Sequence, residues 1–128
     1  MKGIVLRKAK CVNEDDRRAI FELMNGELSV KNMKVLFVKK GDQLLGNHYH
    51  FAREIMYILK GSAIYKMKNL ETGEVEDYNL IAGDVIIRSG RIVHAGIFSE
   101  DSIIIDGCEA TYISSDFNDI RDVILEKE

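Results

Sequence analysis

Short apolar runs separated by turn residues are the feature that most constrains the fold of this chain. The runs are rich in β-branched and aromatic side chains, and glycine, asparagine or aspartate stands between them because the sequence contains no proline. They span residues 34–39, 55–59, 63–67, 78–81, 85–87, 92–97 and 103–105. Turn signals at intervals of about 8–12 residues between such runs are typical of antiparallel sandwiches and barrels. The pattern therefore predicts an all-β fold.

The two ends of the chain have a different pattern. A short C-terminal helix is predicted over residues 116–128 by apolar side chains at helical spacing, Phe117, Ile120, Val123 and Ile124. Near the start, residues 13–26 (NEDDRRAIFELMNG) resemble a capped helix with an acidic first turn and an Asn-Gly stop. The same cluster of charges can equally precede a strand, so both structures stay open for this segment.

Length and charge exclude several classes of protein. A chain of 128 residues can bury one hydrophobic core without disulfides, so we expect a single domain. A formal net charge of −3 with scattered basic residues argues against binding to nucleic acid or to a membrane surface. The apolar runs are far shorter than the roughly 20 residues that a membrane span requires. The start, MKGIVLRKAK, lacks the apolar core of a signal peptide, so we expect a cytoplasmic protein.

Two of the three histidines lie one residue apart in the segment GNHYHFAREIMYILKG. On a strand, side chains at positions i and i+2 point to the same face, so His48 and His50 are expected to share one space, with Tyr49 on the other side. Glu54 has the same parity and can reach that space. The third histidine, His94, follows a second strand–turn–strand segment of similar build. Imidazoles that converge with a carboxylate are a typical ligand set for Mn, Fe, Co, Ni or Zn.

Each of these residues also has a simpler interpretation. A His-x-His pair can lie on the surface or be satisfied in a core, and Glu54 alone would most often be a solvated carboxylate. Glu54 is a better candidate ligand than an isolated carboxylate because it precedes the apolar residues 55–59. A buried charge without a partner would be unfavourable there, and a bound cation would offset that cost. Arg88 and Arg91 could meet an anionic substrate, but we interpret them as solvated turn residues.

At these positions the sequence resembles the cupin family. Residues 46–61 are similar to the first cupin motif, with matching residues Gly46, His48, His50, Glu54 and Gly61. Residues 83–98 resemble the second motif, with Gly83, Asp84 and His94 in place and with Ser89 and Phe98 where the family usually has proline and asparagine. The resemblance implies a single cupin domain over residues 1–128, folded as a small antiparallel jelly-roll barrel. It also implies that the interior is lined by four candidate metal ligands, His48, His50, Glu54 and His94.

Parts of the sequence are further similar to cupins of nucleotide-sugar and surface-polysaccharide pathways, which include dTDP-sugar 3,4-ketoisomerases and relatives of the sugar 3,5-epimerases. The similar segments are GNHYH at residues 46–50, HAGIFSEDS at residues 94–102 and the tail from Tyr112 to Asp119. Leu45 stands where these proteins usually have an arginine, and Phe51 stands where a lysine is often found. The likeness implies an isomerase or epimerase whose small-molecule substrate is a sugar or sugar nucleotide.

Two chemical roles are open for the histidines. With a divalent cation bound, a substrate carbonyl and its neighbouring hydroxyl could chelate the ion, which would stabilise an enediolate, and the candidate bases are Tyr57, Tyr49 and Glu109. Without a cation, His48 and His50 would move protons themselves, as is thought for the ketoisomerases. The alternatives to an isomerase are a non-catalytic sugar-binding module and an iron-dependent dioxygenase.

The strand predicted over residues 55–59 carries apolar side chains on both of its faces. Its outer face therefore needs cover as well as its inner face. A second subunit would provide that cover, so we expect a homodimer.

Overall fold

The protein is built from β-strands throughout residues 1–43 and 45–111, the part of the chain that the computed structural model describes. The strands are β1 (Ile4–Lys8), β2 (Lys10–Glu14), β3 (Ala19–Glu22), β4 (Asn32–Val38), β5 (Leu45–His48), β6 (Glu54–Lys60), β7 (Ser62–Asn69), β8 (Val75–Ile81), β9 (Asp84–Arg88), β10 (Ile92–Phe98) and β11 (Ser102–Cys108). The predicted all-β class is confirmed for these residues. In them no helix is long and apolar enough to cross a membrane.

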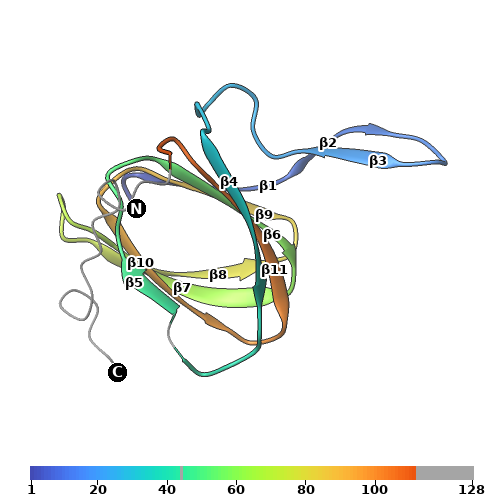
Figure 1. The fold of residues 1–128 in the computed structure, drawn as a ribbon. Coiled ribbons are helices and arrows are strands. Elements are labelled where there is room, and N and C mark those ends of the chain that lie inside the picture. The colour runs from blue at the N-terminus through green and yellow to red at the C-terminus, as the bar shows by residue number, and fades with distance from the viewer. Residues whose placement is uncertain (44, 112–128) are drawn as a thin grey trace.

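Two antiparallel sheets face each other around a common interior, and a hairpin projects from their side (Figure 1). The five-stranded sheet has the order β1-β9-β6-β11-β4, the four-stranded sheet has the order β5-β10-β7-β8, and β2 pairs with β3 in a two-stranded sheet. From β5 onward the chain changes sheet at nearly every turn, which is the connectivity of a jelly roll.

The predicted closed barrel is replaced by an open sandwich. Among the described residues no backbone pairing joins β4 to β5 or β1 to β8. The reason lies in the edge strands: β5 is only four residues long, and within residues 1–43 and 45–111 it pairs with β10 alone while β4 pairs with β11 alone. The predicted C-terminal helix over residues 116–128 lies outside the described residues.

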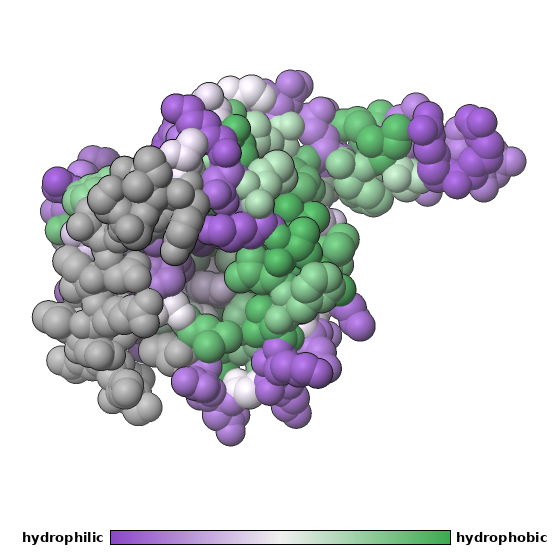
Figure 2. All heavy atoms as spheres, in the orientation of Figure 1, coloured by the Kyte–Doolittle hydropathy of each residue, from purple (hydrophilic) through white to green (hydrophobic). Residues whose placement is uncertain are grey.

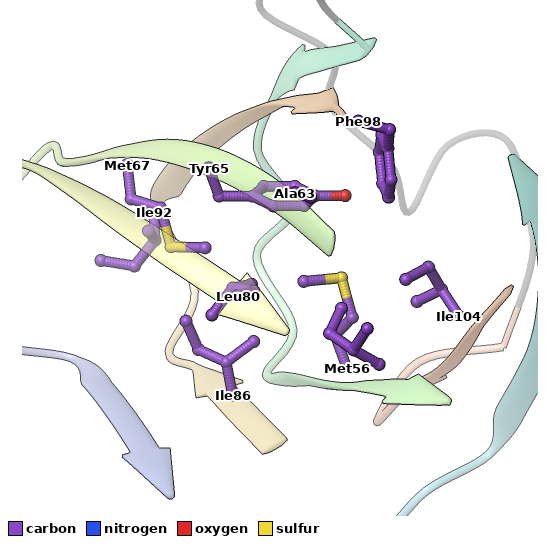
Figure 3. Packing of buried hydrophobic residues seen from close by; sticks show 10 residues of the cluster. Met56, Ala63, Tyr65, Met67, Leu80, Ile86, Ile92, Phe98 and Ile104 are labelled. Carbon is purple, nitrogen blue, oxygen red and sulfur yellow. The ribbon is translucent and has the colours of Figure 1, made fainter. Parts of the chain in front are cut away.

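Alternation along the strands fills the interior between the two sheets (Figure 3). The buried cluster contains Met56, Ile58, Ala63, Tyr65, Met67, Leu80, Ile86, Ile92, Phe98 and Ile104. Tyr65 packs closely against its partner strand at Gly96, where a Cβ atom would lie 2.7 Å from the phenol ring. A side chain at position 96 would therefore displace Tyr65, which explains the glycine there.

Residues 13–26, for which a helix and a strand were both open, form the end of β2, a turn and β3. The charged residues make the turn: the Asp15 carboxylate accepts hydrogen bonds from the backbone N–H groups of Arg17 and Arg18, at 2.8 and 3.1 Å. Such an aspartate turn competes with a helix cap for the same backbone groups. Pairing between β2 and β3 then follows.

The outer face of the five-stranded sheet is only partly covered. Over Ile55 and Tyr57 it is covered by the chain itself, through Leu23, Met24, Leu28 and Val30. Toward the edge it is bare, because Met33, Val35 and Phe37 are 67%, 55% and 78% exposed. Figure 2 shows apolar atoms gathered over β4 and on the part of the β2–β3 hairpin nearest the body.

Candidate active site

Three histidines meet inside the sandwich. His48 at the end of β5 and His94 on β10 are cross-strand partners, and their ring centroids lie 4.6 Å apart. His50 lies beyond the end of β5, with its ring centroid 4.8 Å from that of His48 and 6.0 Å from that of His94. One donor atom from each imidazole lies within 4.8 Å of the others. The structure thus brings together all three histidines that the sequence analysis singled out.

Strand parity explains why these rings share one space. Tyr49, between the two histidines of the pair, is buried on the opposite side, where it packs against Val93 and Ala95. These two residues flank His94 on β10 and point away from it. The alternation of both strands therefore turns three imidazoles inward and leaves Tyr49 outside.

Glu54, the fourth predicted ligand, lies beside the histidines and is engaged by an arginine. Its Oε2 atom accepts a hydrogen bond of 2.6 Å from Arg88 Nη2, and its Oε1 atom lies 3.5 Å from His50 Nε2. Glu54 on β6 and Arg88 on β9 are cross-strand partners, and they are 5% and 4% exposed. The interpretation of Arg88 as a solvated turn residue is therefore wrong. Arg91 is exposed as expected.

His94 is held as a neutral imidazole. Its Nδ1 atom lies 3.3 Å from the backbone oxygen of Ile92, which can only accept, so the proton is on Nδ1 and the lone pair is on Nε2. That Nε2 atom is 3.5 Å from Arg88 Nη2. Burial, and then the charge of Arg88, hold the pKa of His94 well below its usual range.

One further titratable group of the interior, Asp106, escaped the sequence analysis. Asp106 on β11 is a carboxyl whose pKa is raised to about 6, chiefly by burial, while Arg88 opposes the shift and Glu54 adds to it. Burial likewise raises the pKa of Tyr65 to about 12, so its hydroxyl keeps its proton. A charged residue directly after the apolar run 103–105, with the parity of Ile104, was the signal for Asp106.

The candidate bases of the sequence analysis lie elsewhere. Tyr57 neighbours Glu54 on β6 but has the opposite parity, and it packs with the outer cluster around Leu28. Glu109 accepts hydrogen bonds of 2.6 and 2.9 Å from Arg53 and one of 2.8 Å from the N–H of Ser29. The structure does not bring these two residues, or Tyr49, to the histidines.

The histidines fit a divalent cation by their chemistry. Three imidazole donors within 4.8 Å of one another, one of them with its lone pair fixed on Nε2, are suited to a borderline metal ion. Glu54 is placed differently, because Arg88 holds one of its oxygens while the other faces His50. A carboxylate in that position can hold the ring of an imidazole in a fixed orientation.

Comparison with known proteins relates the fold to sugar-nucleotide enzymes. No protein-family model matches the chain, and no curated protein matches it significantly. The TDP-quinovose 3,4-ketoisomerase WlaRB from Campylobacter jejuni has a TM-score of 0.81 at 15% identity, over 95% of each chain. QdtA, a sugar 3,4-ketoisomerase from Thermoanaerobacterium thermosaccharolyticum solved with TDP, has a TM-score of 0.78 at 16% identity, over 96% of this chain and 90% of that one. The RmlC epimerase of Mycobacterium tuberculosis has a TM-score of 0.78 at 17% identity, over 93% and 69%.

At these identities the likeness concerns the fold. It supports the resemblance that the two motifs indicated, and it shows that this antiparallel β architecture occurs in a TDP-quinovose 3,4-ketoisomerase and in a dTDP-4-dehydrorhamnose 3,5-epimerase. The ligands of those enzymes do not identify the ligand of this chain. The chemistry of this chain has to be argued from its own interior residues.

The raised pKa of Asp106 predicts a pH-dependent effect on stability. Its folded value of about 6 lies above the ordinary value of 3.8, so between them the folded protein binds the proton more tightly than the unfolded chain does. The contribution of Asp106 to the free energy of unfolding therefore falls as pH rises through this window, by on the order of 3 kcal/mol. We expect Asp106→Asn to remove that fall, as measured by urea unfolding of both proteins between about pH 4 and pH 7. Parallel pH profiles for the two proteins would contradict the assignment.

Proposed function

We propose that the protein is an isomerase or epimerase acting on a sugar or sugar nucleotide. The observation that carries the proposal is the convergence of His48, His50 and a neutral, buried His94 in the interior of the fold. Proton transfer next to a carbonyl needs groups of this kind at one place, shielded from water. The similarity of the fold to sugar-nucleotide ketoisomerases and epimerases supports the same reaction class.

We further propose that the three histidines hold a divalent cation, of the class Mn, Fe, Ni, Co or Zn. When bound, such an ion supplies Lewis-acid stabilisation of a carbonyl oxygen. The chain supplies the rest: the Ile92 carbonyl fixes the tautomer of His94, and Glu54 faces His50 and orients its ring. The hydroxyl of Tyr65 keeps its proton, so it can donate a hydrogen bond to an anion.

The roles of the histidines without a cation follow from the same geometry. A neutral imidazole accepts a proton through one nitrogen while the other nitrogen donates to a fixed acceptor, as His94 does to Ile92. Because Tyr57, Tyr49 and Glu109 are engaged elsewhere, His48 and His50 are then the groups that would move protons.

The chain's departures from the sugar-nucleotide enzymes bear on the substrate. Leu45 and Phe51 stand where cationic side chains are usual, and they are 40% and 51% exposed. Neither can neutralise a diphosphate. A sugar without a nucleotide is therefore as consistent with these positions as a sugar nucleotide is.

Deuterium exchange tests the proposed reaction. In D2O the protein should exchange the proton next to the keto group of TDP-4-keto-6-deoxyglucose, the compound solved with a variant of QdtA. Replacing His48 or His50 by alanine should slow exchange about 10²–10⁴-fold, because proton transfer would lose its positioned group. The matched control is Tyr57→Phe, which should leave the rate unchanged. Exchange is followed by proton NMR.

The outcomes of this experiment separate the classes of function. Binding of the keto sugar without exchange would replace the proposed enzyme by a binding module, and oxygen consumption would replace it by a dioxygenase. Elemental analysis of the same protein, purified without added metal, should find about one divalent ion per chain. Full metal content in the His48→Ala/His50→Ala double variant would refute the proposed cation site.

We also propose that two copies of the chain associate through the bare face of β4. This face is formed by Met33, Val35 and Phe37, which are all more than half exposed. Monomeric proteins seldom expose neighbouring apolar side chains to this extent. A two-stranded hairpin is marginally stable by itself, and the β2–β3 hairpin exposes apolar residues of its own, Val12, Ile20 and Phe21. Residues 31–40 carry four lysines and no acidic residue, whereas residues 10–22 carry four acidic and three basic residues. The hairpin of a second copy would therefore bring apolar side chains and a net negative charge to this apolar, positively charged segment.

A charge placed on the β4 face tests this association. We expect light scattering to find a dimer for the wild-type chain and a monomer for Phe37→Glu, because the glutamate would be buried against apolar side chains. The control is Val75→Glu, at a residue 54% exposed on the edge strand of the other sheet, which should remain dimeric. A monomeric wild type, or a dimeric Phe37→Glu variant, would contradict the proposed interface.

A further inference from the structure

The wall of the interior that faces the histidines carries three charged side chains. They come from neighbouring strands of the five-stranded sheet: Arg88 on β9, Glu54 on β6 and Asp106 on β11. Glu54 pairs directly with Arg88, and Asp106 is the cross-strand partner of Met56, two residues farther along β6 on the same face. This charged wall touches the histidines through Arg88, whose Nη2 atom is 3.5 Å from His94 Nε2.

The hydrogen bonds of this wall do not satisfy all of its atoms. A guanidinium has five N–H donors and cannot accept, while an ionised carboxylate can only accept. Arg88 Nη2 is used by Glu54, but Arg88 Nη1 is buried and has no hydrogen-bond partner among the residues that the structure describes. The same holds for the buried Oδ1 atom of Asp106. Arg88, which is only 4% exposed, therefore offers one donor and Asp106 one acceptor on the inward face of the five-stranded sheet.

The two groups act on each other electrostatically. Burial is the main influence on the pKa of each group, and Arg88 partly offsets the rise that burial causes in the pKa of Asp106. In the sheet the two residues lie on strands that flank β6, with Arg88 level with Glu54 and Asp106 level with Met56 on the same inward face. Buried polar groups are nearly always paired in native proteins, so an unpaired donor and an unpaired acceptor on one inward face are typical of a site that a ligand completes.

We propose that Arg88 and Asp106 bind the two adjacent oxygens of an α-hydroxy carbonyl compound. Arg88 Nη1 donates to the carbonyl oxygen, and Asp106 Oδ1 accepts from the neighbouring hydroxyl. The proposal rests on the proposed function for the role of the histidines, and it deepens it by naming the part of the substrate that is recognised. A carbonyl held by Arg88 lies beside His94, so the carbon that loses or gains a proton faces the imidazoles.

Three small molecules that differ in one group test this recognition. Dihydroxyacetone has both the carbonyl and the hydroxyl, glycerol lacks the carbonyl, and acetone lacks the hydroxyl. In NMR titrations of the full chain at about pH 7.5, the wild type should bind dihydroxyacetone about tenfold more tightly than either analogue, because each analogue leaves one buried group unpaired.

Two variants assign the preference to its residues. Arg88→Lys keeps a cation for Glu54 but offers no second guanidinium nitrogen, so the preference over glycerol should fall below about twofold. Asp106→Leu removes the acceptor, so the preference over acetone should fall in the same way. The matched control is Asp84→Asn, at a buried carboxyl on the inward face of β9 at the far end of the strand, which should keep both preferences. Thermal unfolding verifies that each variant is folded. The result for Arg88→Lys tests the role of Arg88, and the result for Asp106→Leu tests the role of Asp106.

The result can contradict the recognition without touching the proposed reaction. Equal affinities for dihydroxyacetone and glycerol in the wild type, or variants that keep both preferences, would overturn the assignment of Arg88 and Asp106. A protein that prefers dihydroxyacetone but exchanges no proton of a keto sugar would keep this assignment and refute the isomerase. The two ideas therefore fail separately.

Discussion

The buried ion pair between Glu54 and Arg88 is the interaction on which the interior of this protein depends. Both side chains are almost fully shielded from water, where a single charge without its partner is strongly unfavourable. The pair joins β6 to β9, and Arg88 reaches on to His94 in the opposite sheet. The guanidinium that pairs with Glu54 therefore also contacts the opposite wall of the site. Stability and site geometry are coupled through one guanidinium group.

The interior is divided along its strands into an apolar part and a polar part. On the inward face of β6 the side chains change from Glu54 to Met56 to Ile58, and on β9 the charged Arg88 follows Ile86 with the same parity. The apolar part is closely packed and supplies most of the burial that holds the sheets together. The polar part can then keep histidines and charges in a defined geometry at the strand ends.

Local patterns in the sequence predicted the strands and the convergence of the histidines. Parity places His48 and His50 on one face and Tyr49 on the other, and parity is a property of neighbouring residues. Arg88 could not be predicted in this way, because its partner is 34 positions away in the sequence and the register between β6 and β9 decides the pairing. The same applies to closure of the sheets, which depends on whether β4 and β5 pair across the loop between them. Residues 13–26 show a different limit, since the hydrogen bonds of Asp15 can serve either a helix cap or a turn.

The unclosed side of the sandwich has a consequence for the behaviour of the chain at high concentration. An edge strand such as β4 presents a row of backbone amides and carbonyls to which a strand from another molecule could add. Lys34 lies within this strand, and Lys39 and Lys40 follow its end, so three like charges would be brought together whenever two such edges approached in register. Lysines on an edge are a device by which proteins prevent strand-by-strand growth into fibrils. The protein can thus leave its β-sandwich open on one side and still resist amyloid-like assembly.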